Sequence, residues 1–424
     1  MEMTKYKLGD LCRIASSKRI FESEYVEKGV PFIRGQEISD GSILDPKASF
    51  ECYISQSRYE EIKEKYGKPT KGDILITAVG TIGNLCYLDK DIDFYFKDGN
   101  VIWFSEIISS CEGKFLFHFM KSSFFKDQLK YFMIGAVQKA LTIDMLKKVE
   151  VPLPPLSEQK KIASVLSALD DKIALNKKMN QKLEAMAKRL YDYWFVQFDF
   201  PDKNGHPYKT TGGPMTYNPT LKREIPVGWE VKTLDEYLDC NKYSLTAKSS
   251  YDFIQYLDTS SLTENTLESL QKYGSQAESP SRAKRIVYAN DILYSTVRPQ
   301  QKHYGIIKNP AQNMIASTGF AILSCKYGSE YNDMFYLFLI QEKNLIKLSA
   351  IADSNASSYP SFNPSDLLNL SICLPEDIKT IEPLVKKFSS LFGIIERNQK
   401  ENQKLTALRD KLLPLLMNGQ VVVG

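Results

Sequence analysis

The stretch NKKMNQKLEAMAKRL at residues 176–190 returns in closely similar form, NQKENQKLTALRDKL, at residues 398–412. When residues 169–190 are aligned with residues 391–412, ten of the 22 positions are identical. Shorter blocks upstream match in the same order, namely 142–154 with 363–375, 71–84 with 289–302, 31–39 with 252–260, and 6–12 with 231–238. A repeat of roughly 200 residues is much longer than the unit of a solenoid. The chain is therefore predicted to be a tandem duplication in which each half is a globular domain followed by a long helix.

Both copies of the stretch show the heptad pattern of a helix that packs along another helix. In residues 166–194 and 388–416, mainly apolar side chains recur at alternating steps of three and four residues. These positions form a stripe along one side of each helix, which we call the seam. Each helix should be about 35 residues long, or roughly 50 Å at ~1.5 Å per residue. We expect Ser157 and Thr380 to cap the two N-termini, and Pro414 to end or kink the second helix.

Two asparagines stand at matching seam positions in each copy. A polar seam residue costs stability but fixes register and partner. We therefore favour pairing of the two helices with each other over two separate amphipathic helices with incidental polar residues, and a pseudo-twofold axis would make the pair antiparallel. The residues predicted to pair the helices are Ile173, Asn176, Asn180, Leu183, Ile395, Asn398, Asn402 and Leu405.

The globular halves have the patterns of a mixed α/β fold. Strands are expected at 72–79, 101–107, 291–297 and 319–324, and helices at 57–66, 114–132 and 331–348. Between the halves, residues 198–230 are rich in Pro, Gly and Thr, which predicts an ordered but irregular linker.

Composition limits the classes of protein that fit. With 424 residues, 43% of them hydrophobic, the chain can form two or three folded domains. The net charge of +4 is a weak indication of a polyanionic partner. No apolar run is long enough to span a membrane, and the N-terminus MEMTKYKLGD lacks the core of a signal peptide. The seven scattered cysteines fit free thiols, so we expect a cytoplasmic protein without a membrane partner.

The motifs of common enzymes are missing from the sequence. The three histidines, His118, His206 and His303, have no metal-ligand spacing, and His118 is expected to be a core residue. The sequence contains no G-x-x-x-x-G-K-[ST], no G-x-S-x-G and no G-x-G-x-x-G. A nuclease-like P-D…E-x-K pattern at 201–232 falls mainly in the predicted linker and is given little weight. We therefore predict no catalytic site, and no cofactor or metal in this chain.

Two related but divergent domains could read two patches of one long ligand, and duplex DNA presents the same groove every ~34 Å. Polar side chains in corresponding segments suit base edges, although a solvated surface position is the commoner explanation for any one of them. The candidates are Arg34, Gln36, Thr77, Thr81, Asn84, Gln138 and Lys139 in the first half, and Gln255, Ser295, Thr296, Arg298, Gln300, Lys302, His303 and Tyr359 in the second. Polar loops that recur after the strands at 72–79 and 291–297 favour the functional interpretation.

Three segments and the tandem layout resemble a known family, the specificity (S) subunit of type I restriction–modification systems. The segments are VEVPLPPLSEQKKIASVLSALDDKI at 149–173, YDYWFVQFDFP at 191–201 and REIPVGWEVKTL at 223–234. The resemblance extends over essentially the whole chain. The second copy departs from it, because LPEDIKTIEPL at 374–384 lacks the second proline and the E-Q-K.

The resemblance implies an α+β (mixed) fold, in which two globular target recognition domains are separated by two long antiparallel coiled-coil helices. It implies recognition domains at 1–155 and 231–376, conserved helical spacers at 156–197 and 377–424, and a linker at 198–230. Each recognition domain would read one half of a split, asymmetric DNA site, and the S subunit itself would be non-catalytic.

The same resemblance implies the partners. Two DNA adenine methyltransferase (M) subunits and restriction–translocation (R) subunits would join this chain on double-stranded DNA. S-adenosylmethionine, ATP and Mg would be held by those partners. Two alternatives stay open, namely a coiled-coil scaffold whose paired domains bind proteins, and a recognition subunit of a methylation-only defence system.

Overall fold

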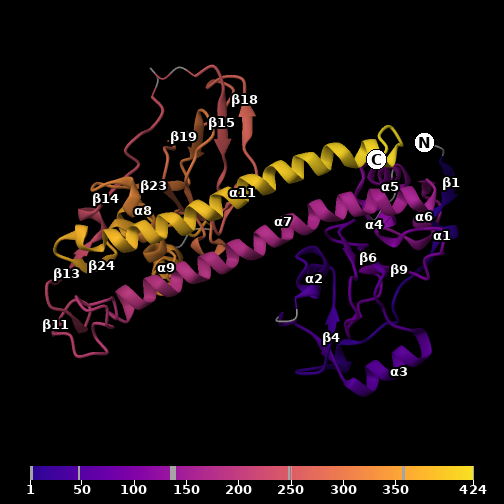
Figure 1. Ribbon diagram of the computed structural model, residues 1–424, viewed down its shortest axis with the longest axis horizontal. Helices are drawn as coiled ribbons and strands as arrows, with labels where there is room; N and C mark the ends of the chain where they lie inside the picture. Colours follow the sequence, from indigo (N-terminus) through magenta and orange to yellow (C-terminus); the bar gives the residue numbers. More distant parts are fainter. Residues whose placement is uncertain are drawn as a thin grey trace. The chain divides into compact units, whose positions relative to one another are not determined.

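The computed structural model describes residues 3–45, 48–133, 140–246, 249, 251–355 and 359–423 (Figure 1). The chain forms two compact units, each of which is described by itself. The first unit comprises Met1–Ala174 and Asn402–Gly424, and the second comprises Leu175–Glu401. Both long helices therefore contribute one part to each unit. None of the helices in the described ranges combines the length and apolar composition that crossing a bilayer requires.

The first unit is built on two four-stranded sheets and a separate ladder. The central sheet is antiparallel, with the order β2 (Arg13–Ala15), β9 (Val101–Ser105), β6 (Ile74–Thr77) and β7 (Leu85–Tyr87). The second sheet has the order β3 (Tyr25–Val26), β5 (Tyr53–Ile54), β4 (Val30–Ile33) and β8 (Tyr95–Phe96), and β4 runs parallel to β8. The ladder joins β1 (Thr4–Lys7) to β10 (Glu150–Leu153). The short helices of this unit are α1 (Leu8–Leu11), α2 (Gln36–Ser39), α3 (Gln56–Tyr66), α4 (Gly113–Lys121), α5 (Ser123–Met133) and α6 (Ile143–Lys147).

The alternation of side chains along the central strands divides the core of the first unit into layers. Ile74 and Phe104 point to the face that packs against α4 and α5, in one cluster with Phe115 and Phe119. Leu75 and Trp103 point to the opposite face and pack against the second sheet. Because successive residues of a strand face opposite sides, nearly continuous apolar strands such as β6 and β9 are suited to burial on both faces.

The second unit repeats this plan. Its central antiparallel sheet has the order β14 (Leu238–Cys240), β23 (Phe320–Cys325), β20 (Asp291–Ser295) and β21 (Tyr304–Ile307). The companion sheet has the order β18 (Gln271–Tyr273), β15 (Ile254–Leu257), β22 (Met314–Ser317) and β19 (Ala283–Ile286), and β15 runs parallel to β22. Short ladders join β13 (Trp229–Thr233) to β24 (Ser371–Pro375) and β16 (Leu262–Thr263) to β17 (Thr266–Leu267). The short helices are α8 (Asn332–Leu339), α9 (Glu342–Ser354) and α10 (Pro364–Leu368).

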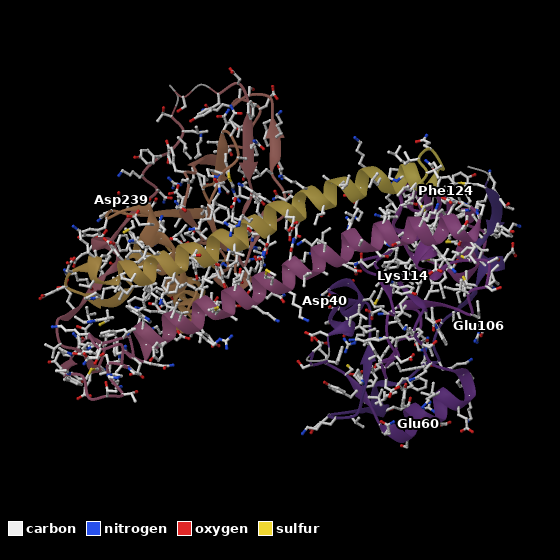
Figure 2. The ribbon with its side chains drawn as sticks, viewed as in Figure 1. Asp40, Glu60, Glu106, Lys114, Phe124 and Asp239 are labelled. Atoms are coloured by element: carbon white, nitrogen blue, oxygen red, sulfur yellow. The ribbon has the colours of Figure 1, made fainter. Side chains whose placement is uncertain are left out.

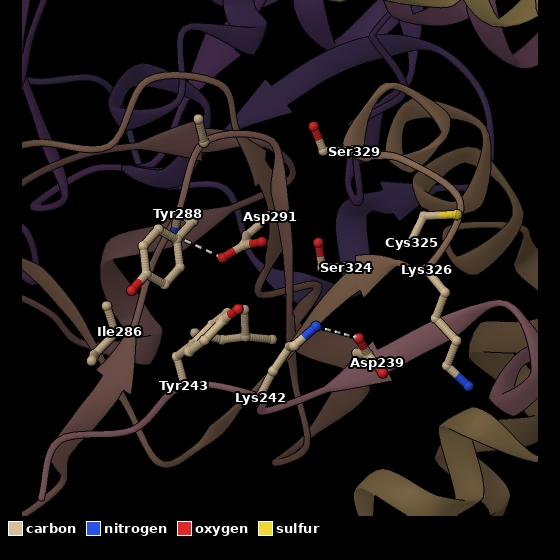
Figure 3. Close-up of a pocket in the computed structure, with 12 residues that line it drawn as sticks. Asp239, Lys242, Tyr243, Ile286, Tyr288, Asp291, Ser324, Cys325, Lys326 and Ser329 are labelled. Carbon is tan, nitrogen blue, oxygen red and sulfur yellow. Dashed lines mark hydrogen bonds and ion pairs between the residues drawn. The ribbon is translucent and has the colours of Figure 1, made fainter.

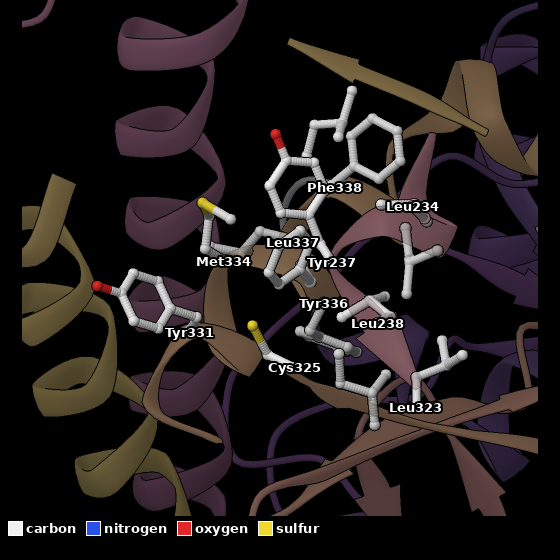
Figure 4. Close-up of a cluster of buried hydrophobic side chains, with 14 of the residues drawn as sticks. Leu234, Tyr237, Leu238, Leu323, Cys325, Tyr331, Met334, Tyr336, Leu337 and Phe338 are labelled. Atoms are coloured by element: carbon white, nitrogen blue, oxygen red, sulfur yellow. The ribbon is translucent and has the colours of Figure 1, made fainter. Parts of the chain in front are cut away.

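The core of the second unit lies between its central sheet and α8. Leu323 and Cys325 of β23 pack against Met334 and Leu337 of α8, and Leu238 joins the same cluster (Figure 4). The cluster also contains Phe388, Phe392 and Ile395 of the second long helix. The globular part of this unit is therefore held on the helix by a continuous apolar contact.

The aligned sequence blocks fall on equivalent strands in the two units. The block at 71–84 contains β6 and its partner at 289–302 contains β20. The block at 31–39 covers all but the first residue of β4, and 252–260 contains β15. In each case the two strands next to the aligned strand have the same order and direction. The companion sheets differ in their fourth strand, which lies beside β5 in the first unit and beside β22 in the second. The predicted fold class, a mixed α/β tandem duplication with two long helices, is confirmed.

Several local predictions are corrected by the structure. The helix expected at 114–132 is two helices, since Ser122 is extended and separates α4 from α5. The helix expected at 331–348 is likewise divided into α8 and α9 by the extended residue Gln341. The linker predicted to be irregular contains a hairpin of β11 (Met215–Asn218) and β12 (Arg223–Pro226). Stacked Phe200 and Trp229, with ring centroids 5.0 Å apart, help to order it.

The two long helices are α7 (Leu156–Tyr191) and α11 (Glu382–Met417), each of 36 residues (Figure 1). Both cap predictions are wrong. Ser157 lies inside the first turn of α7, and Thr380 lies in a 3-10 turn that precedes α11 and is capped by Asp377. Pro414 does not end α11, which continues to Met417.

Polar groups hold the helices together within the second unit, where they run antiparallel. Asn398 Nδ2 donates to Asn180 Oδ1 at 2.8 Å, and Asn180 Nδ2 is 3.3 Å from the Ile395 carbonyl. Asn176, which is buried, donates to Glu401 Oε2 at 2.7 Å. Leu183 packs in the same cluster as Ile395. The buried amide of Asn176 and the half-buried amides of Asn180 and Asn398 thus meet polar partners in this part of the seam.

In the first unit the helices are also antiparallel and are joined by a charged cluster. Asn402 Nδ2 is 3.4 Å from the Ile173 carbonyl, and Leu405 is half-buried. One turn along α7, the carboxylate of Asp170 accepts hydrogen bonds from Arg409 Nη1 of α11 and Lys121 Nζ of α4, both at 2.8 Å. This carboxylate therefore ties both long helices to the globular part of the unit.

The electrostatics of this cluster follow from its partial burial. Burial opposes the charge of Asp170, but the hydrogen bonds from Lys121 and Arg409 outweigh it and hold the pKa of the carboxyl below its usual value. Burial lowers the pKa of the neighbouring His118 to about 4, so this histidine is neutral at pH 7. Its Nε2 lies 3.0 Å from Ser167 Oγ, which agrees with a core position.

We expect Asp170→Asn to lower the free energy of unfolding by about 2 kcal/mol at pH 7, because two half-buried cations lose their shared counter-charge. The folded-state pKa of Asp170 is depressed, so its contribution is complete above the ordinary aspartate pKa and is lost as the pH falls through the lower folded value. Urea unfolding at several pH values measures this difference. The exposed neighbour provides the control, since Asp171→Asn should change stability by less than about 0.5 kcal/mol. Equal stabilities of the two variants would contradict the assignment.

Candidate nucleic-acid interface

Several candidate residues of the first unit gather where β6 ends. Thr77, its last residue, is fully buried, and its hydroxyl donates to the Thr81 carbonyl and accepts a hydrogen bond from the Asn84 N–H at 3.0 Å. Gly80 and Gly83 have positive φ values of 71° and 90°, which side chains disfavour. The connection to β7 is thereby folded into a compact turn that leaves Thr81 exposed.

A serine on α2 joins the polar side chains of this turn. Ser39 Oγ lies 3.0 Å from Thr81 Oγ1 and accepts a hydrogen bond from Asn84 Nδ2 at 2.8 Å. Gln36 is exposed at the start of the same helix, and its Nε2 is 3.4 Å from a carboxylate oxygen of Asp40, which Figure 2 labels. We call Gln36, Ser39, Thr81 and Asn84 the first polar patch. Sequence reasoning missed Ser39, although it ends the aligned block 31–39.

Arg34 follows β4 and is engaged with a neighbouring loop. Its Nη2 donates to Cys52 Sγ at 2.6 Å, and its Nη1 lies 3.5 Å from Glu51 Oε2. The side chain is still 41% exposed. A guanidinium that is partly paired but accessible could exchange an exposed carboxylate for a phosphate or a base edge, so Arg34 stays a candidate.

In the second unit the corresponding turn follows β20. Its backbone includes two non-glycine residues in the left-handed region, Arg298 with φ of 45° and Lys302 with φ of 56°. The Arg298 N–H donates to the Pro360 carbonyl at 2.9 Å, and the Phe362 N–H donates to the Thr296 carbonyl at 3.0 Å. A neighbouring segment therefore supports a backbone conformation that costs energy, and such strain is frequent at binding sites.

Three candidates project from this turn and its supporting segment. Arg298 places its guanidinium 4.9 Å from the centre of the Tyr359 ring, a cation–π arrangement, and both side chains are exposed. Gln300 lies in the turn and is also exposed. We call Arg298, Gln300 and Tyr359 the second polar patch. It carries an arginine and an aromatic ring where the first polar patch carries neutral side chains, so the two units present different chemistry.

The other candidates of the second unit have intramolecular partners. Lys302 Nζ forms an ion pair with Glu264 Oε1 at 2.9 Å. His303 Nδ1 lies 3.0 Å from Thr263 Oγ1 and from the Leu262 carbonyl, so the ring is held against the β16–β17 ladder. Gln255 lies on the companion sheet, where its Nε2 donates to the Gln312 carbonyl at 3.0 Å.

Three candidates are corrected because their side chains are buried. Thr77, Ser295 and Thr296 are each at most 9% exposed. Ser295, which aligns with Thr77, bonds the Val297 carbonyl at 2.9 Å, and Thr296 bonds the Gly319 carbonyl at 3.1 Å. These hydroxyls fix the loops and do not reach outward to bases. Gln138 and Lys139 lie outside the described residues.

The two patches have one property in common, which is a group of accessible hydrogen-bonding side chains. Over the ranges that the structure describes, no group of three or more His, Cys, Asp or Glu side chains is arranged to hold a metal ion. The exposed amide, hydroxyl and guanidinium groups of the patches are donors and acceptors suited to base edges and phosphates. Each patch includes residues of a loop that follows a buried central strand, and loops held by a rigid sheet are the usual setting of a binding surface.

Comparison with known proteins agrees with this architecture. The specificity subunit of the type I restriction enzyme MjaIX from Methanocaldococcus jannaschii is 28% identical to this chain, and the alignment covers 99% of this chain and 97% of the relative. The HindI specificity subunit from Haemophilus influenzae is 22% identical, with 98% and 99% covered. The crystal structure of a type I restriction–modification S subunit from M. genitalium matches the fold with a TM-score of 0.58 at 15% identity, covering 98% of this chain and 96% of that one.

The family described as the type I restriction modification DNA specificity domain matches residues 1–185 and 226–407. The two matched ranges fall on the two halves of the duplication, and each contains a central sheet, a polar patch and most of a long helix. The chain therefore belongs to the type I restriction–modification DNA specificity family.

Proposed function

We propose that this chain reads an asymmetric, bipartite DNA site, one half-site per domain, for a type I restriction–modification complex. The observation that carries the proposal is the pair of polar patches. Each patch is centred on the loop after one of two equivalent strands, β6 and β20. One patch nevertheless consists of amides and hydroxyls, and the other of arginine, glutamine and tyrosine. Equivalent placement supports a common type of ligand, and different side chains support a different sequence in each half-site.

The proposed division of labour follows the repeat. Residues 1–155 and 231–376 would be the target recognition domains, 156–197 and 377–424 the helical spacers, and 198–230 the linker. Arg34 and the first polar patch would contact one half-site, and the second polar patch the other. With a net charge of only +4, this chain would need phosphate contacts from partner subunits to bind DNA tightly.

An apolar stripe on α7 supports docking of a partner subunit. Leu175, Met179 and Met186 are 54%, 42% and 54% exposed and lie one and two turns apart, on one face of the helix. Exposed apolar stripes of this kind mark protein–protein contacts. We propose that an adenine methyltransferase (M) subunit docks here, that restriction (R) subunits join the complex, and that these partners hold S-adenosylmethionine, ATP and Mg. Catalysis would belong to them, in the cytoplasm, and this chain would only recognise the target.

Exchange of one domain tests separate recognition. Replacing residues 1–155 with the equivalent segment of a relative should change one half of the methylated motif and leave the other half and the spacer unchanged. Long-read detection of methylated adenines in a host that expresses the complete system measures the motif. A change in both halves would refute reading by independent domains. Methylation without any cleavage of unmodified DNA would assign the chain to a methylation-only system.

Arg298 tests the second polar patch. Arg298→Ala should weaken DNA binding by about 1–3 kcal/mol and relax the preference at one base pair, because a bidentate contact is lost. Arg298→Lys keeps the charge but cannot form the planar pair, so it should recover non-specific affinity without recovering the base preference. The control is Lys326→Ala, which removes a positive charge just after β23. Phe320, at the start of β23, pairs with the end of β20 near Arg298, so Lys326 lies at the far end of that strand and its removal should leave the base preference unchanged. Full specificity in Arg298→Ala would remove this residue from the interface.

The apolar stripe predicts a docking defect. Met179→Asp should weaken association with the M subunit at least tenfold, because a charge would be buried in the contact. Lys177→Asp places the same charge at an exposed position two residues away and should have little effect. Analytical ultracentrifugation of mixtures measures association, and thermal melting checks that both variants are folded. If Met179→Asp assembles normally, the stripe does not bind the M subunit.

A further inference from the structure

The second unit contains a pocket of about 620 Å³ beside the start of β20 (Figure 3). Asp291 and Ser324 line it from adjacent strands of the central sheet. Ile286 and Ile322 contribute aliphatic surface. Tyr243 and Tyr288 contribute an edge-to-face aromatic pair whose ring centroids are 4.8 Å apart, and both are half-exposed. Asp239, Lys242 and Lys326 add charged side chains, the first two joined by an ion pair at 3.0 Å. The pocket thus combines a buried carboxylate with apolar, aromatic and charged walls.

The duplication shows what occupies the equivalent place in the first unit. Asp73 precedes β6 as Asp291 begins β20, in the aligned segments GDIL and NDIL. Trp103 pairs with Leu75 in the first central sheet, as Ile322 pairs with Leu293 in the second, so Ile322 stands where the first unit has Trp103. Because paired residues of neighbouring strands share a face, the tryptophan and the isoleucine lie on the same side of their sheets.

In the first unit the indole fills its site and satisfies the carboxylate. Trp103 Nε1 donates to Asp73 Oδ2 at 2.9 Å, and the ring is 6% exposed. The same carboxylate accepts the Thr70 N–H at 2.7 Å. The guanidinium of Arg13, on the adjacent strand β2, lies 5.9 Å from the indole centre and covers one face of it.

In the second unit the carboxylate is retained but the indole is not. Asp291 accepts the Tyr288 N–H at 2.7 Å, which reproduces the bond from Thr70, and it is only 5% exposed. Asp239 on β14 pairs with Ser324 as Arg13 pairs with Ser105, so an acidic residue stands where the first unit has Arg13. It holds Lys242 in an ion pair at 3.0 Å. Burial raises the pKa of Asp291 to about 6. A carboxylate removed from water needs donors, and here the Tyr288 N–H and the Ser324 hydroxyl supply them. The replacement of tryptophan by isoleucine opens space in front of this carboxylate, where a further donor can bind.

We propose that the pocket binds the indole ring of a tryptophan from a partner polypeptide, with its N–H donated to Asp291 and its faces against Tyr243, Tyr288 and Ile322. Tryptophan side chains are frequent anchors of protein interfaces, because they combine large apolar area with one donor. The pocket lies at the start of β20, whereas the turn with Arg298 follows the end of that strand. This placement, and the indole in the equivalent site, favour a side chain over a DNA base.

The test uses the full chain and N-acetyltryptophanamide as the probe, followed by saturation-transfer NMR and calorimetry. The probe should bind. Its indole N-methyl derivative should bind at least about fivefold more weakly, since a hydrogen bond of about 1 kcal/mol is lost. Affinity should fall as the pH drops from 7.5 to 5, because protonation of Asp291 replaces a charge-assisted hydrogen bond by a weaker neutral one. The other charged groups of the lining, Asp239, Lys242 and Lys326, keep their charges over this range. Absence of binding at millimolar probe, or equal affinity of the two probes, would overturn the proposal. Tighter binding of adenosine than of the indole would overturn the assigned occupant.

Two variants locate the site. Asp291→Asn retains an oxygen for the Tyr288 N–H but presents an NH₂ group to the pocket, so binding should be lost. Ile322→Trp supplies an internal indole as in the first unit, and should abolish binding while raising the melting temperature. Asp252→Asn changes an exposed carboxylate of the same unit and should bind as wild type does. If Ile322→Trp does not fold, Asp291→Asn alone decides, and wild-type affinity in that variant refutes the site.

Discussion

The structure depends on the antiparallel contact between α7 and α11. Each unit contains one segment of each helix, and neither segment could leave its apolar seam in water without a large loss of stability. Polar groups in the seam fix the register of one helix along the other. Asn180 with Asn398, and Asp170 with Arg409, satisfy each other only in one register. A slip by one turn would separate these half-buried groups from their partners, and a polar group shielded from water without a partner costs more than the bond itself contributes.

The central sheets then set what each domain can vary. Their strands are apolar on both faces, so substitutions there are limited by packing, while the loops that follow β6 and β20 are free to differ. A buried hydroxyl at the end of each strand, Thr77 or Ser295, anchors the loop to its own backbone. A rigid sheet with an anchored but variable loop is a suitable basis for two domains that recognise different sequences.

The same duplication makes differences between the domains interpretable. In the first unit Trp103 donates a hydrogen bond to Asp73 and fills the space beside it. In the second unit Asp291 and Ile322 occupy the equivalent positions, and a pocket remains between them and the neighbouring side chains. The change keeps the costly buried carboxylate and removes its aromatic donor. Selection for stability alone would be expected to remove such a group, because an apolar replacement is often at least as stable. An internal copy therefore serves as a reference for function as well as for fold.

The sequence by itself determined the duplication, the long helices, their pairing and the family, because heptad periodicity and repeated blocks are local properties of the chain. It also identified Arg298 and Thr81 as polar loop residues that prove to be exposed. Only the tertiary structure showed that Thr77, Ser295 and Thr296 are buried, that Ser39 joins Thr81 to Asn84, and that a 3-10 turn precedes α11. The pocket beside Asp291 was likewise undetectable, since it depends on which residues meet across β20 and β23. Burial and cross-strand contact arise from residues far apart in the chain, and periodicity carries no record of them.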